Sequence, residues 1–176
     1  FCPGGPGSFF GDTPQSYTGN EPASMRAKRN NFDAYLQVFN RLEHYALLGQ
    51  DFSKNELIIM SGTFLAAPLE YQEEFIGNAF QAFNDFSMFF EDNKLNFQKF
   101  KEFFELDGEF KDVERIKRVQ EKILGLKKPC RLEDEQKRNE RTLLEKAFTE
   151  NERTLLEKAF TENERTNCRV VALCLE

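Results

Sequence analysis

Apolar residues recur at three- and four-residue spacing through the middle of the chain, which is the pattern of helices with one buried face. The stretches between them are short and polar. Ser53 and Glu56 have the spacing of a helix-capping box, which predicts that a helix begins at Ser53. In all, the pattern predicts helices over residues 27–42, from 53 to before Pro68, over 69–86, from about 97, and over 110–124.

The two ends of the chain have different patterns. Residues 1–26 are rich in Pro, Gly and Ser and have no hydrophobic period, so we expect them to be disordered. Residues 139–150 and 151–162 are identical copies of one segment, and a third copy begins at 163. On a straight helix the leucine pairs of the two copies lie about 120° apart, so they form no continuous seam. Two interpretations remain open: a solvated helix left by a tandem duplication, or an arm that binds a partner in several copies.

Two stretches have the layout of the second half of a helix-loop-helix calcium motif. Phe52-Ser-Lys-Asn-Glu-Leu57 and Asp92–Phe104 each place an apolar residue and a few polar residues before a predicted helix. Leu57 and Phe97 lie forty residues apart. In these spacings residues 32–104 resemble the calgranulin and calcyclin (S-100) family of small dimeric EF-hand proteins. The resemblance implies that Phe52 and Leu95 pair across the two loops.

The fold class implied by this resemblance is all-α. A paired EF-hand helix-loop-helix domain would be followed by an extra amphipathic helix and a helical repeat tail. The expected division of the chain is a disordered segment over 1–26, the EF-hand pair over 27–106, the additional helix over 107–129 and the charged tail with its 12-residue repeat over 130–176.

The resemblance also implies a set of calcium ligands in the first loop. Backbone carbonyls would come from Glu43, Ala46, Leu48 and Asp51, and a bidentate carboxylate from Glu56. A calcium ion takes six to eight oxygen ligands, and a bidentate acid usually completes the loop. Glu56 also fits the role of the capping-box acid, and both interpretations stay open.

The second loop lacks most of the oxygen ligands that calcium requires. Met88 and Phe90 stand where the first two side-chain ligands belong, and Lys99 replaces the bidentate acid. Only Asp92 and Asn96 could ligate, so this loop is predicted to be non-functional. Calcium binding by the chain is therefore expected to be weak or absent.

Composition narrows the function classes. The net charge of −6 argues against a nucleic-acid partner, which usually meets a basic surface. No apolar run is long enough to cross a membrane. A single His, no Gly-rich phosphate loop and no nucleophile elbow predict that the chain is not an enzyme.

Together these features predict an EF-hand calcium-binding-type protein that acts as a protein-interaction scaffold. By resemblance it would bind protein partners and form a homodimer through its first and fourth helices. The expected location is the cytoplasm, with secretion as the alternative. The alternative function is that of an unrelated helical-bundle protein, secreted or structural, with no calcium role.

Overall fold

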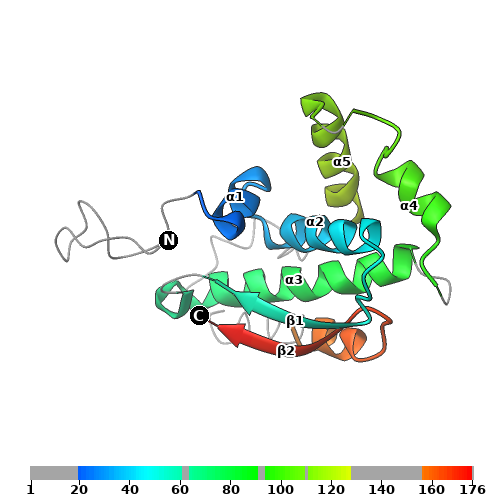
Figure 1. The fold of residues 1–176 in the computed structure, drawn as a ribbon. Helices are drawn as coiled ribbons and strands as arrows, with labels where there is room; N and C mark the ends of the chain where they lie inside the picture. The colour runs from blue at the N-terminus through cyan, green and yellow to red at the C-terminus, as the bar shows by residue number, and fades with distance from the viewer. Residues whose placement is uncertain (1–19, 61–63, 91–93, 110, 128–155, 176) are drawn as a thin grey trace, which may run out of the picture.

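The computed structural model describes residues 20–60, 64–90, 94–109, 111–127 and 156–175, and these form a group of helices with a two-stranded sheet on one side (Figure 1). Residues 156–163 are also helical. The elements in chain order are α1 (Pro22–Arg29), α2 (Ala34–Leu47), β1 (Lys54–Ile59), the short 3-10 helix η1 (Phe64–Ala66), α3 (Leu69–Phe90), α4 (Phe97–Phe103), α5 (Val113–Leu126) and β2 (Arg169–Leu175).

The sheet consists of β1 and β2, which run parallel. Lys54 pairs with Arg169 at one end and Ile59 with Leu175 at the other. A helix starting at Ser53 is therefore the wrong prediction for this segment. The run Leu57-Ile58-Ile59 is short, apolar and partly β-branched, and such a run suits a strand when a partner strand is available.

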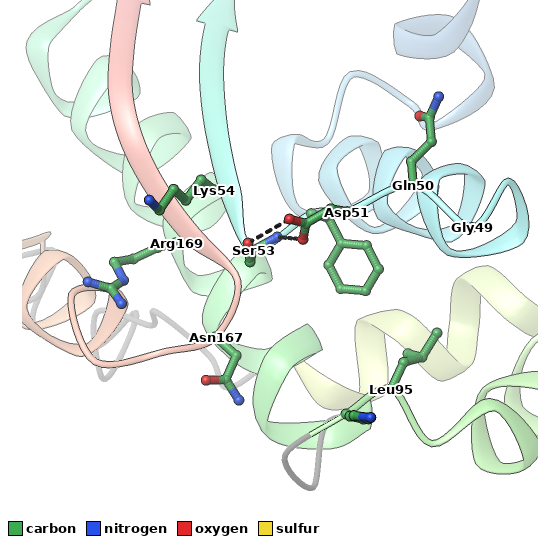
Figure 2. Close-up of a pocket in the computed structure, with 10 residues that line it drawn as sticks. Gly49, Gln50, Asp51, Ser53, Lys54, Leu95, Asn167 and Arg169 are labelled. Carbon is green, nitrogen blue, oxygen red and sulfur yellow. Dashed lines mark hydrogen bonds between the residues drawn. The ribbon is translucent and has the colours of Figure 1, made fainter.

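The turn before β1 explains why the capping-box interpretation fails. Asp51, not Ser53, is the organising side chain: it accepts hydrogen bonds from the Ser53 amide at 2.9 Å and from the Ser53 hydroxyl at 3.1 Å (Figure 2). The Ser53 carbonyl then accepts from the Arg169 amide at 3.0 Å, which starts the ladder between the strands. Glu56 lies within β1, with its side chain exposed, and caps no helix.

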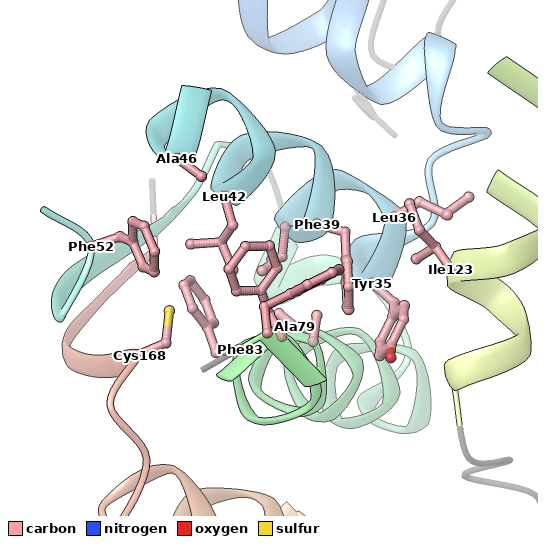
Figure 3. Close-up of a cluster of buried hydrophobic side chains, with 14 of the residues drawn as sticks. Tyr35, Leu36, Phe39, Leu42, Ala46, Phe52, Ala79, Phe83, Ile123 and Cys168 are labelled. Atoms are coloured by element: carbon pink, nitrogen blue, oxygen red, sulfur yellow. The ribbon is translucent and has the colours of Figure 1, made fainter. Parts of the chain in front are cut away.

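The core lies where α2 packs on α3, and its side chains come from elements throughout the chain (Figure 3). Phe86 of α3 is fully buried, and its ring centroid lies 4.8 to 6.4 Å from those of Phe39, Phe52, Phe90 and Phe100. Most of these pairs are edge-to-face, the arrangement that aromatic quadrupoles favour.

A second contact between α2 and α3 is polar. The hydroxyl of Tyr35 donates to Asp85 Oδ2 at 2.7 Å inside the core. Burial and this hydrogen bond raise the pKa of Tyr35. The phenol is therefore neutral at any ordinary pH, and a buried donor is satisfied rather than left unpaired.

The prediction of an all-α fold built on an EF-hand pair is wrong, because β1 and β2 form a parallel sheet. The single helix predicted over residues 27–42 is replaced by α1 and α2. Asn31 and Phe32 adopt positive φ values of 52° and 60°, which interrupt the helical backbone between them. Helix α2 then continues to Leu47, so the expected first loop is partly helical. Phe52 and Leu95 both line one pocket. The strand that follows Phe52, however, pairs with β2 and not with the loop that contains Leu95.

The later helices follow the periodic pattern more closely. Helix α3 covers the expected segment and extends to Phe90, and α4 begins at Phe97 as predicted. The Asn96 side chain caps α4 by accepting from the Lys99 amide at 3.1 Å. In these segments a single helix carries its own hydrophobic stripe, so the local pattern was sufficient.

Helix α5 is fastened to the turn that follows α4. The buried Arg115 guanidinium donates to the backbone carbonyls of Phe104 and Glu105. The Glu105 carboxylate accepts from Arg118 at 2.9 Å and from Lys122 at 2.6 Å. Hydrogen bonds from Arg118 and then Lys122 lower the pKa of Glu105 to about 2.

We expect this carboxylate to titrate near 2 rather than near its ordinary 4.5. Because the folded-state pKa is lowered, the contribution of these pairs to stability is present above pH 4.5 and is lost as the pH falls toward 2. A carbon-detected NMR titration of Glu105 measures the pKa directly. The substitution Arg118→Gln should move it toward 4.5, whereas Lys111→Gln should leave it unchanged. A value near 2 in the Arg118 variant would contradict this account.

The helix over 156–163 joins the repeat to the core. Phe160 packs on Phe80 of α3 with ring centroids 4.4 Å apart. Asn163, the first residue of the third copy, is buried, and its Nδ2 donates to Asn84 Oδ1 at 2.8 Å. This part of the repeat is therefore packed against α3. The first copy, residues 139–150, lies outside the described residues.

Candidate functional site: a basic pocket at the start of the sheet

A pocket of about 790 Å³ opens where both strands begin (Figure 2). Three segments meet there: the connection from α2 to β1, the residues before α4 and the residues before β2. The lining residues are Gly49, Gln50, Asp51, Phe52, Ser53, Lys54, Lys94, Leu95, Asn167 and Arg169.

The first wall of the pocket is shaped by the end of α2. Gly49 has a φ of 65°, a left-handed conformation that suits glycine. Its amide donates to the Ala46 carbonyl at 3.2 Å, and the Gln50 amide donates to the Tyr45 carbonyl at 2.9 Å. This pair of bonds is a Schellman motif, which ends the helix and turns the chain into the pocket.

A buried amide network holds the opposite wall. Asn163 Oδ1 accepts from the Val170 amide at 2.8 Å, and its Nδ2 donates to the Cys168 carbonyl at 3.3 Å. From β1, Asn55 Nδ2 donates to the Arg169 carbonyl at 3.3 Å. The backbone on both sides of Arg169 is therefore fixed, and the start of β2 has a defined position beside β1.

The pocket is basic. Lys54 and Arg169 are partners in the strand register and lie beside each other at its rim, and Lys94 lines it from the segment before α4. Within the part of the chain that the structure describes, none of these three cations forms a salt bridge. The hydrogen bonds from Ser53, and more weakly the charge of Lys54, lower the pKa of Asp51. Three cations and the amides of Gln50 and Asn167 can bind an anion such as a phosphate group.

The structure separates the predicted calcium ligands. Of these residues only Asp51 reaches the pocket, and its carboxylate already accepts from Ser53. Glu43 is half-buried within α2, where burial raises its pKa, and it accepts from Asn40 Nδ2 at 3.4 Å. The other predicted ligands lie apart from the pocket. Ala46 is buried in α2, Leu48 caps the end of α2, Glu56 lies in β1 and Asn96 caps the start of α4, while Asp92 lies outside the described residues.

No metal site stands out in these ranges. The described residues contain no group of three or more His, Cys, Asp or Glu side chains that could hold a metal ion.

The sequence interpretation also missed Lys54, Lys94 and Arg169. They lie in three distant segments, and only the pairing of the strands brings them to one rim.

No protein-family model matches the chain. Curated proteins do. The chain is 53% identical over 98 residues to the tRNA uridine(34) acetyltransferase of Methanocaldococcus jannaschii, and the aligned region covers 54% of this chain and 18% of that protein. It is 50% identical over 82 residues to Elongator complex protein 3 of Homo sapiens, covering 47% and 15% of the two chains. For the Saccharomyces cerevisiae protein of that name the identity is 48% over 87 residues, covering 48% and 16%.

About half of this chain is related to these proteins. In turn, the chain spans less than a fifth of the length of each of these relatives. The resemblance to the S-100 family is therefore wrong, because it rested on the spacing of a few residues and the identity extends over 82 to 98.

Several functional predictions fall with the S-100 resemblance. Calcium as a cofactor and an EF-hand scaffold are wrong, and so is the alternative of an unrelated secreted or structural bundle. The prediction that the chain is not an enzyme is contradicted too, since the archaeal relatives are named as acetyltransferases. The argument from net charge against a nucleic-acid partner conflicts with the same names, which specify tRNA.

The dimer prediction meets a structural difficulty. The residues expected at that interface are Leu36, Phe39, Phe100, Phe103 and Phe104. All are buried in the core of one chain except Phe103, which is partly buried against it. In the described ranges, no helix combines the length and the apolar character needed to span a membrane.

Proposed function

We propose that this chain is part of an enzyme that acetylates a uridine of tRNA, and that the described segment contacts the RNA. The observation that carries the proposal is a sequence identity of 51 to 53%, over 82 to 98 residues, with proteins named for this activity or for the Elongator complex. Because some of these relatives are named as proteins of the Elongator complex, we expect this chain to act within a complex of different proteins and not as a homodimer. A tRNA substrate favours the cytoplasm as its location.

The basic pocket supports an RNA contact. Phosphate oxygens receive most of the hydrogen bonds and charge contacts in protein complexes with nucleic acids. Lys54, Lys94 and Arg169 can supply such contacts, because none of the three forms a salt bridge among the described residues, although Asp51 also lines the pocket. A chain with a net charge of −6 can still bind RNA here, because the local field at a pocket differs from the field of the whole protein.

Acetyl transfer tests the proposed activity. The full-length protein, incubated with radiolabelled acetyl-coenzyme A and tRNA, should place label on the tRNA. Mass spectrometry of the digested RNA should then locate the acetyl group on a uridine. A tRNA in which that uridine is replaced by cytidine should receive none. Label that stays off the RNA under all conditions would refute the proposed function.

A double substitution tests the pocket. Lys54→Gln with Arg169→Gln should weaken tRNA binding about tenfold, because two phosphate contacts and their counterion release are lost. Both side chains are exposed, so folding should be unaffected. Fluorescence anisotropy with labelled tRNA measures the affinity. The control, Lys111→Gln with Lys117→Gln, removes the same charge from exposed positions near and on α5. Equal losses in the two variants would show that the pocket has no specific role.

A further inference from the structure

The helix over 156–163 is held on α3 by two apolar contacts. Phe160 packs on Phe80 with ring centroids 4.4 Å apart. Leu156 packs over Gly77, where a Cβ atom would lie 3.6 Å from the leucine Cδ1. Because Gly77 has no side chain, this leucine packs directly against the backbone of α3. The two contacts lie about one helical turn apart and fix the helix on one face of α3.

Asn84 adds a polar contact on the same face of α3. Its Nδ2 donates to the Ala159 carbonyl at 2.9 Å, and its Oδ1 accepts from Asn163 Nδ2 at 2.8 Å. Both asparagines are buried, so an occupant without the second asparagine would leave polar atoms unpaired. Gly77, Phe80 and Asn84 follow one another at three- and four-residue spacing, and we call these three residues the repeat dock.

Each docked residue named above has an identical counterpart twelve residues earlier in the chain. Residues 139–154 and 151–166 share one sequence of sixteen residues. The counterparts of the docked residues are Leu144, Ala147, Phe148 and Asn151. The identity extends through the turn after the helix, where Thr166 has Thr154 as its counterpart. The sequence that fits the repeat dock is therefore present twice.

We propose that the repeat dock accepts two registers of the chain, and that the first copy can replace the second. In the exchanged register Phe148 packs on Phe80, and Asn151 bonds to Asn84. The two occupants are identical, so the contacts at the dock do not distinguish them. The registers differ in the connection to β2, because the exchange inserts residues 155–166 as a loop before β2.

The length of this loop sets how often the exchanged register occurs. The entropy cost of closing a loop grows only with the logarithm of its length. A loop of one repeat should make the exchanged register about twenty- to fortyfold less populated than the register in the structure. It is therefore a minor state, within reach of any change that weakens the docking of the second copy.

A repeat from a second molecule is the competing occupant of the dock. The first copy of the same chain is favoured because it is joined covalently to α3. Such a tether gives an effective concentration of the order of millimolar, which a free second molecule does not reach in dilute solution.

The exchange reaches the basic pocket. Asn163 holds the start of β2, since its side chain bonds to the Val170 amide and the Cys168 carbonyl. When Asn151 takes over these bonds, β2 stays paired with β1. The inserted loop then lies next to Asn167, which lines the pocket. The border of the pocket changes while the sheet stays intact, whatever ligand the pocket binds.

The test breaks the docking of the second copy and measures whether the first copy replaces it. Phe160→Ala with Asn163→Ala removes the ring on Phe80 and the amide on Asn84. Hydrogen exchange of the Val170 amide, followed by NMR in the full-length protein with isotope-labelled valine, measures how often the dock opens. The loss of protection should stop at about twenty- to fortyfold, because the first copy then occupies the dock.

Removing the replacement should uncover the full effect. Phe148→Ala and Asn151→Ala, added to the same variant, leave neither copy with its ring and its amide. Protection of Val170 should then fall by at least about a further tenfold.

Two controls make the result specific. Phe148→Ala with Asn151→Ala in the otherwise unchanged chain spares the docked copy, so protection of Val170 should equal that of the parent. Glu145→Ala with Lys146→Ala, added to the variant with the broken second copy, should cause no further loss. The counterparts of these two residues, Glu157 and Lys158, are exposed in the docked helix.

Circular dichroism checks the fold of each variant. Should the variant with four substitutions fail to fold, Phe160→Ala alone is compared with Phe148→Ala plus Phe160→Ala. The second of these should lose at least about twofold more protection at Val170.

Equal losses of protection with and without the substitutions in the first copy would overturn the proposal, since that copy would contribute nothing. Protection that rises with protein concentration would also overturn it, because the occupant would then be the repeat of a second molecule. The same holds for unchanged protection in every variant, which would mean that the dock does not hold β2.

Discussion

Replacing Phe86 with alanine should lower the free energy of unfolding by about 3 to 5 kcal/mol. The ring is 0% exposed and touches aromatic rings from α2, the loop before β1, α3 and α4. Its removal leaves a cavity that these neighbours cannot fill without leaving their own contacts. The loss should therefore combine the lost burial of the ring with the cost of the cavity.

Urea denaturation followed by circular dichroism measures this effect. Phe97→Ala is the matched control, because that ring is 52% exposed at the start of α4. It should cost less than about 1 kcal/mol. A similar small loss at Phe86 would mean that the aromatic cluster is not the centre of the core.

The second large effect is expected at Asn163. Substitution by alanine should cost about 2 to 4 kcal/mol, because it leaves Asn84 Oδ1, the Cys168 carbonyl and the Val170 amide without this partner in a buried site. Unlike the Phe86 substitution, it should act first on one strand. The amide of Val170 should lose its protection from hydrogen exchange before the amides of α3 do.

Hydrogen exchange with mass spectrometry and denaturation together test this prediction. Thr161→Ala, on the same helix, removes an exposed hydroxyl that bonds to the Glu157 carbonyl, and should change stability by less than about 0.5 kcal/mol. A double-mutant cycle with Asn84→Ala should show strong coupling, since the two amides share a bond. If the Asn163 and Asn84 substitutions changed stability independently of each other, the buried amide network could not be what holds β2 in place.

The helices that the sequence predicted well are those whose hydrophobic stripe is continuous. Helices α3, α4 and α5 could be found from spacing alone, with errors of a few residues at their ends. The segment 54–59 could not. Its local signals conflict, since Ser53 and Glu56 favour a helix start and Leu57 to Ile59 favour a strand, and the conflict is resolved by β2.

The functional error has a different cause. The spacing that suggested EF-hands marks no EF-hand, although Phe52 and Leu95 both line one pocket. Spacing of apolar residues is shared by many helical folds, however, and carries little information about ancestry. The cations Lys54, Lys94 and Arg169 have no motif, so their grouping could be seen only once the strands were paired.

The separation of the two strands in the chain sets the order in which the protein can fold. Asn55 and Arg169, joined across the sheet, are 114 residues apart in the sequence. Closing a loop of that length costs roughly 4 kcal/mol of chain entropy before any contact repays it. The packing of α2 on α3 is far more local and should form first. During synthesis β1 must therefore wait, unpaired, until more than a hundred further residues have left the ribosome, and this interval is when a chaperone would have most to protect.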